Sequence, residues 1–192
     1  MNAYDFLHRS GFRGLLGRVY HVEVVGAERI PESGPAILAA NHASIWDPFI
    51  LGLVTSREIH YMAKVELFRL RPVAALLRSL NAFPVERGSG DRTAISEAAR
   101  LLGRGALLGI FPQGTSKPER QNGWHRGAAR LALVTGAPLV PVRLSGTRPL
   151  PRPTRVRIEV GEPFRVAVAR PTVAAARSLT AQLEETVTAW PA

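Results

Sequence analysis

The run Ala36-Ile37-Leu38-Ala39-Ala40 constrains the fold most, because it has the length of a strand and offers no polar face to water. Wholly apolar strands are typical of parallel sheets that are covered on both faces. Further short apolar segments alternate with helical patterns along the chain, which is the order of an α/β protein. We therefore expect one α/β domain with a mixed, mostly parallel sheet flanked by helices.

The pattern of apolar residues and turn signals gives bounds for the expected elements. The expected strands are 21–25, 36–40, 59–63, 83–85, 106–111, 139–144 and 155–160. The expected helices are 47–54, 72–80, 91–102, 127–135 and 173–189. Asp47 is expected at the N-cap of the first helix with Pro48 in its first turn. Pro141 interrupts an apolar strand, which predicts an edge strand or a bulge.

The N-terminal segment combines apolar side chains with Arg9, Arg13 and Arg18. Its longest apolar run is far below the roughly 20 residues that span a bilayer. It also has no signal-peptide cleavage pattern. The composition predicts a basic amphipathic helix in the lipid interface; the alternative is an ordinary helix packed on the domain. We take residues 1–20 as a membrane-contacting segment and 21–192 as the main domain, since no repeat or linker marks a second one.

The charge balance favours anionic partners. The net charge is +10, from 25 Lys and Arg residues against 15 Asp and Glu residues. Nucleic-acid recognition is not expected, because no recognition helix, zinc site or aromatic sheet motif is found. The chain has no cysteine and its five histidines are scattered, so neither thiolate chemistry nor a metal site is predicted. A membrane surface or an acidic ligand fits the charge better, and no feature indicates an oligomeric state.

His42 and Asp47 form the first candidate site. They lie five positions apart, after the apolar strand and at the start of a helix, so the imidazole and the carboxylate can meet. Imidazole accepts protons near neutral pH, and a carboxylate on its other nitrogen would fix the tautomer and stabilise the imidazolium. No serine or cysteine nucleophile stands out, which favours a base acting on a substrate hydroxyl. A structural histidine near a capping aspartate is the alternative.

Two further segments follow expected strands. Arg87 precedes the loop 88–90 and can present a planar fork to a phosphate or carboxylate, although a solvated surface arginine has the same pattern. Residues 111–117 (Phe-Pro-Gln-Gly-Thr-Ser-Lys) contain a Gly114-Thr115 turn that can offer backbone N–H groups to an oxyanion or phosphate. A plain turn is the alternative there.

Taken in order, these segments resemble the glycerolipid acyltransferase family, whose best-known members acylate 1-acyl-glycerol-3-phosphate. The resemblance runs from about Val22 to Thr147. The segments that carry it are Gly26–Pro31, the Asn41–Asp47 box, Lys64–Phe68, Arg87, Gly114–Thr115 and Gly136–Val142.

The resemblance implies acyl transfer from acyl-CoA or acyl-carrier protein to a hydroxyl of a lyso-lipid, with 1-acyl-glycerol-3-phosphate as the first candidate acceptor and phosphatidic acid as its product. It implies that His42 is the general base and Asp47 its orienting partner. Amides near Gly114 and Thr115 would stabilise the oxyanion, and Arg87 would bind the acceptor phosphate. It implies no metal and no bound cofactor. The expected place is the cytoplasmic side of the cell membrane, as a peripheral protein.

The chain departs from the family pattern in its third motif, usually Phe-Pro-Glu-Gly-Thr-Arg-Ser. Gln113 replaces the glutamate and Ser116 the arginine, with Lys117 one place later. We group Gln113 to Lys117 (Gln113, Gly114, Thr115, Ser116, Lys117) with Arg87 as expected substrate-binding residues. Asn81 also stands where a glycine is common. The changes keep open an aminolipid or glycolipid acceptor, or a catalytically silent lipid-binding homologue.

Overall fold

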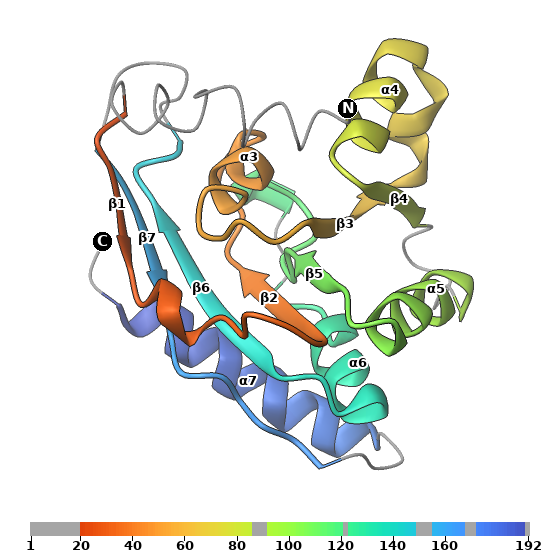
Figure 1. The fold of residues 1–192 in the computed structure, drawn as a ribbon, viewed down its shortest axis with the longest axis vertical. Coiled ribbons are helices and arrows are strands. Elements are labelled where there is room, and N and C mark those ends of the chain that lie inside the picture. The colour runs from red at the N-terminus through yellow and green to blue at the C-terminus, as the bar shows by residue number, and fades with distance from the viewer. Residues whose placement is uncertain (1–19, 86–91, 121–122, 149–154, 168–171, 191–192) are drawn as a thin grey trace.

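The strand β2 (Ala36–Ala40) is the middle strand of a seven-stranded sheet, and all five of its residues are fully buried. Leu38 packs into one apolar core, and Ile37 packs into a second core on the opposite face. The sheet is therefore covered on both faces, as predicted. The computed structural model describes residues 20–85, 92–120, 123–148, 155–167 and 172–190 as a single α/β domain (Figure 1).

The elements follow the predicted alternation of strands and helices. The remaining strands are β1 (Val22–Val25), β3 (Ile59–Lys64), β4 (Ala82–Val85), β5 (Leu107–Ile110), β6 (Leu139–Ser145) and β7 (Val156–Val160). The α-helices are α3 (Asp47–Leu51), α4 (Arg71–Ser79), α5 (Arg92–Gly103), α6 (Gly127–Thr135) and α7 (Val173–Ala189). Short 3-10 helices are η1 (Ala27–Arg29), η2 (Val65–Arg69) and η3 (Pro118–Arg120).

The strand order β1-β7-β6-β2-β5-β3-β4 gives a mostly parallel sheet. Strands β6, β2, β5, β3 and β4 run in one direction, and β7 pairs antiparallel to β6. The carboxyl ends of five strands therefore meet at one edge, where α/β folds place their ligand sites. At this edge α3 follows β2, and the segment of η2 and α4 follows β3 (Figure 1).

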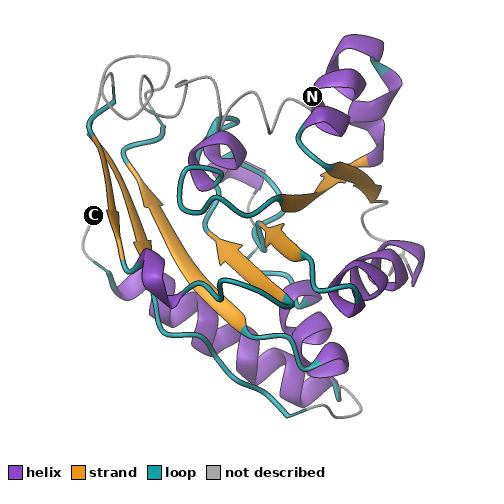
Figure 2. Ribbon diagram, in the orientation of Figure 1, coloured by secondary structure: helices purple, strands orange, loops and turns teal. Residues whose placement is uncertain are grey.

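Helices lie on both sides of the sheet (Figure 2). Side chains of α5, α6 and α7, such as Leu102, Leu131 and Leu183, form one core with Ile37. Ile50 and Leu51 of α3 join the other core with Leu38. None of the described helices is long and apolar enough to cross a bilayer. Residues 1–19, which hold nearly all of the predicted amphipathic segment, lie outside the described residues.

The prediction that Asp47 caps α3 was wrong. Trp46 is the N-cap residue, and Asp47 is the first residue of the helix itself. Oδ2 of Asp47 accepts hydrogen bonds from the backbone of the preceding loop, and Oδ1 has no hydrogen-bond partner among the described residues. The helix also ends at Leu51, three residues earlier than expected.

Pro141 lies in a central strand, at a bulge. It pairs with Ala39 of β2 on one side, so the alternative of an edge strand was wrong. On the other side the pairing of Leu139 with Phe164 and that of Val142 with Val160 differ by one residue in register. The missing N–H of Pro141 falls at this change of register, where no ladder donor is needed.

Candidate active site

His42 and Asp47 lie in contact at the carboxyl edge of the sheet. His42 is the second residue after β2, and Asp47 opens α3. The distance from Nδ1 of His42 to Oδ2 of Asp47 is 2.8 Å. The structure therefore brings together the two side chains that the five-residue spacing singled out.

The loop between them holds the carboxylate in one orientation. Oδ2 of Asp47 accepts hydrogen bonds from the N–H groups of Ala43 at 2.7 Å and Ser44 at 2.8 Å. The Asp47 side chain is fully buried, whereas 17% of the His42 side chain is exposed. A buried carboxylate that has three N–H donors on one oxygen has little freedom to turn. The imidazole is thus held through Nδ1 on its buried side, and a small part of its side chain remains exposed to solvent.

Asn41 anchors the residue before the imidazole. Its Nδ2 donates to the Leu144 carbonyl at 2.9 Å, and its Oδ1 accepts from the Leu144 N–H at 2.7 Å. The side-chain amide therefore imitates a peptide group and extends the β2–β6 ladder beyond Ala40. This role was missed by the sequence analysis, because the two residues are 103 positions apart.

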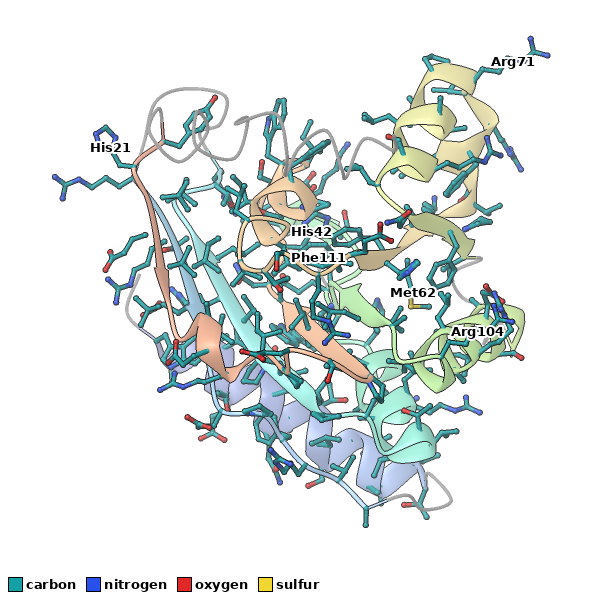
Figure 3. All side chains as sticks on the ribbon, viewed as in Figure 1. His21, His42, Met62, Arg71, Arg104 and Phe111 are labelled. Carbon is teal, nitrogen blue, oxygen red and sulfur yellow. The ribbon has the colours of Figure 1, made fainter. Side chains whose placement is uncertain are left out.

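Phe111 and Gln113 tie the end of β5 to the imidazole. The Phe111 ring stacks on the His42 ring, with centroids 4.4 Å apart and planes inclined by 26° (Figure 3). Oε1 of Gln113 accepts a hydrogen bond from the His42 backbone N–H. A glutamate offers the same oxygen, so this contact does not depend on the departure from the family pattern. Gln113 lies against the base, and what else it binds stays a prediction.

The remaining predicted residues lie in the loop after Gln113 or outside the described part. Gly114 has a φ of +73°, which a glycine adopts freely, and its N–H donates to the Phe111 carbonyl at 2.9 Å. Thr115 Oγ1 accepts from the Lys117 N–H at 3.2 Å. Ser116 is half-buried and Lys117 is exposed. Arg87 falls in 86–91, outside the described residues.

Tyr61 supports the pair from β3, and the sequence analysis missed it. Its hydroxyl donates to the Pro48 carbonyl at 2.8 Å, next to Asp47 in the chain. Its ring lies nearly parallel to the Phe111 ring, with the planes inclined by 9° and the centroids 6.4 Å apart. A Cβ at Gly109 would stand 2.6 Å from the Tyr61 ring, so only glycine leaves room for it. A glycine inside an apolar strand was the available signal, since it indicates a close approach of a neighbour.

The arrangement is suited to proton transfer. With its hydrogen on Nδ1 and directed at Asp47, a neutral imidazole has its lone pair on Nε2. In the described part of the chain, no three His, Asp or Glu side chains gather where one metal ion could hold them.

Comparison with known proteins identifies similar chains. A sequence model of the acyltransferase family matches residues 21–145. The 1-acyl-sn-glycerol-3-phosphate acyltransferase of Bacillus subtilis is 33% identical over 150 residues, which is 76% of this chain and 75% of that protein. The chloroplastic enzyme of the same name from Arabidopsis thaliana is 29% identical over 67% of this chain, which spans 37% of its length.

A solved structure is similar over almost the whole chain. The crystal structure of the 1-acyl-sn-glycerophosphate acyltransferase PlsC from Thermotoga maritima superposes with a TM-score of 0.68 and 26% identity. The match covers 94% of this chain and 79% of that one. The sheet and its flanking helices are therefore the fold of that enzyme.

Proposed function

The chain belongs to the acyltransferase family, and on that premise we propose that it transfers a fatty acyl group from a thioester to a hydroxyl of a lyso-lipid. The first candidate acceptor is 1-acyl-glycerol-3-phosphate, which would give phosphatidic acid. The names of the relatives from Bacillus subtilis and Thermotoga maritima support this acceptor. Acyl-CoA and acyl-carrier protein are both candidate donors.

The contact between His42 Nδ1 and Asp47 Oδ2 carries the proposal, because it holds the imidazole in the arrangement that a general base needs. Nε2 of His42 takes the hydroxyl proton as the oxygen attacks the thioester carbonyl carbon. Asp47 stabilises the imidazolium that forms. The tetrahedral intermediate then expels the thiolate, the C–S bond breaks, and the imidazolium returns its proton to the sulfur. No metal or bound cofactor takes part.

Phe111 contributes by restricting the base. Its ring covers one face of the His42 imidazole, so the imidazole cannot swing away from Asp47 without losing the stacking contact. Pre-orientation of this kind lowers the entropy lost when the reacting atoms align. Phe111 is thus a positioning residue in the proposed mechanism.

The loop after β5 is the proposed oxyanion site. We assign oxyanion stabilisation to the backbone amides of this loop near Gly114 and Thr115, where the Gly114 N–H bond to the Phe111 carbonyl shapes the turn. The Gln113 bond to the His42 backbone keeps this loop beside the base. Arg87, Ser116 and Lys117 remain the proposed contacts for the acceptor head group.

Two alternatives follow from the altered third motif. One is an aminolipid or glycolipid acceptor, since Gln113 and Ser116 replace charged residues of the family pattern. The other is a catalytically silent lipid-binding protein, against which the intact contact of His42 with Asp47 argues. In either case we propose a peripheral protein on the cytoplasmic side of the membrane, with the lipid surface as a partner.

A matrix of donors and acceptors tests the proposal. The purified chain is incubated with acyl-CoA or acyl-carrier protein and with lysophosphatidic acid, an aminolipid or a glycolipid, and the product is identified by mass spectrometry. Acylation of lysophosphatidic acid supports the proposal. Acylation of another lipid alone supports the alternative acceptor. Binding of acyl-lipid without turnover for any pair would establish the silent homologue instead.

A further inference from the structure

Large apolar side chains are exposed at the same edge of the sheet as His42. They are Ile45 and Trp46 before α3, Leu67 in η2, Leu70 between η2 and α4, and Leu76 in α4; we call these five the apolar face. Ile45 is 74% exposed, Leu70 62% and Leu76 49%, although side chains of this size normally lose most of their area on folding. A group of such residues at one edge indicates an interaction surface.

The two parts of the apolar face lie at neighbouring places in the fold. The first follows β2 and the second follows β3, and only β5 separates these strands. Two strand spacings amount to about 10 Å. Ile45 and Trp46 therefore lie in the loop that carries the proposed base, and Leu67, Leu70 and Leu76 lie in the segment that leaves the same carboxyl edge at β3.

Basic side chains are interleaved with the leucines. Residues 64–80 contain Lys64, Arg69, Arg71 and Arg78 but a single acidic residue, Glu66. Glu66 is paired with Lys64 at 3.2 Å. No carboxylate of the described residues lies within ion-pair distance of the three arginines. Arg71 points away from the molecule at the far end of α4 (Figure 3).

This combination matches the surface of an anionic bilayer. Leucine side chains enter the boundary between head groups and acyl chains, while arginines beside them keep their charge at the phosphates. Tryptophan is also favoured at this depth, which accommodates Trp46. A protein partner would satisfy the charge, but it would not by itself explain an exposed leucine, Leu70, between Arg69 and Arg71.

We propose that the apolar face docks on an anionic phospholipid bilayer, with Arg69 and Arg71 in the head-group layer. The choice of a lipid surface rests on the proposed function, in which the acceptor is a membrane lipid. The docked chain turns the carboxyl edge of the sheet, and His42 with it, toward the bilayer. A lyso-lipid then reaches the base without leaving the interface.

Site-specific fluorescence tests the orientation. The chain has no cysteine, so Leu70→Cys provides a single site for an environment-sensitive fluorophore. Val173→Cys is the matched control, since Val173 is 66% exposed on α7, far from α4 in the fold (Figure 1). Vesicles of phosphatidylcholine and phosphatidylglycerol should shift the emission at position 70 to shorter wavelength, and lipids brominated in the acyl chains should quench it. The label at position 173 should do neither.

If vesicles do not change the emission of the label at position 70, the proposal is overturned, whether or not the chain sediments with the vesicles. So does a response at position 70 to acyl-carrier protein alone, which would make the face a docking site for a donor protein. A concentration-dependent dimer that Leu70→Gln dissociates would identify a second copy as the occupant, and would also overturn it.

Vesicle affinity supplies the second measurement. The double variant Leu70→Gln, Leu76→Gln should bind vesicles about tenfold more weakly than the parent. The double variant Arg69→Gln, Arg71→Gln should also bind about tenfold more weakly, and its affinity should depend less on salt than that of the parent. Val173→Gln with Arg177→Gln should bind like the parent. Equal binding by all variants contradicts the proposal. Turnover of dispersed lyso-lipid, measured without vesicles, should be the same in these variants as in the parent. If the parent itself shows no turnover, the result counts against the proposed function and not against docking.

Discussion

The hydroxyl of Tyr61 donates a hydrogen bond to the carbonyl oxygen of Pro48 at 2.8 Å, and so links β3 to the helix that begins with Asp47. Through its ring, Tyr61 also lies parallel to Phe111, which stacks on His42. One buried side chain thus braces both members of the proposed catalytic pair. Tyr61 is not adjacent to His42 or Asp47 in the sequence, so the tertiary structure brings it beside them.

Tyr61→Phe removes this hydrogen bond and keeps the ring. The Pro48 carbonyl also accepts from the Gly52 N–H at 3.1 Å, so it is not left without a donor. We expect a loss of about 1 kcal/mol in the free energy of unfolding, measured by urea denaturation. We also expect kcat to fall more than KM changes, because substrate contacts are intact. A variant with the stability and kcat of the parent would show that the brace is unimportant.

Gly109→Ala tests the space that Tyr61 occupies. The new Cβ would stand 2.6 Å from Cε1 of Tyr61 and 2.9 Å from Cγ2 of Ile59, both in a packed core. Overpacking of this kind costs about 1–3 kcal/mol of unfolding free energy. Gly103→Ala is the matched control, because nothing lies within 4 Å of a Cβ built there. Equal denaturation midpoints for the two variants would contradict the packing described for Tyr61.

His60 gives the stability of the protein a dependence on pH. Burial lowers the pKa of His60 below its ordinary value of 6.5, and the nearby Glu58 and Glu97 oppose this only in part. Because the unfolded chain binds the proton more readily, the contribution of His60 to stability is complete above about pH 6.5 and is lost as the pH falls through the lower folded value.

Melting temperatures measured at neutral and mildly acidic pH check this dependence. We expect the decrease in Tm on acidification to be smaller in His60→Gln than in the parent. His125→Gln, at an exposed histidine, should decrease like the parent. A decrease in His60→Gln that equals that of the parent would refute the assignment.

The altered third motif makes a prediction about acceptor choice. Gln113→Glu together with Ser116→Arg restores the usual family pattern, and arginine supplies the planar fork that suits a phosphate. We expect the ratio of kcat/KM for lysophosphatidic acid to that for an aminolipid or glycolipid to rise. The bond from the His42 N–H to the oxygen at position 113 should survive, so kcat should be retained. An unchanged ratio would show that acceptor choice lies elsewhere.

Local features of the sequence were enough to predict much of the fold. The all-apolar strand Ala36–Ala40 and the helices 127–135 and 173–189 have the predicted bounds, since each depends on its own pattern of apolar residues. The approach of His42 to Asp47 also follows from a local spacing of five residues.

Contacts between distant segments could not be predicted from local patterns in the sequence. Asn41 bonds to Leu144 across 103 positions, and Gln113 bonds to His42 across 71. Pro141 is tolerated in a central strand because the pairing with β7 changes register there. The capping role expected of Asp47 failed for a local reason, since its Oδ2 accepts hydrogen bonds from Ala43 and Ser44 in the loop before the helix.

The most direct test of the central proposal is the rate at which the His42→Ala variant releases thiol from acyl-CoA. The assay uses the acceptor lipid that the parent acylates. The chain has no cysteine, so a thiol reagent reports only the released coenzyme. We expect turnover to fall by about 10²–10⁴-fold, the usual contribution of a general base. Circular dichroism should match the parent, and His21→Ala, at an exposed histidine far from the site (Figure 3), should keep full activity. Parental turnover by well-folded His42→Ala would contradict the assignment of His42 as the base.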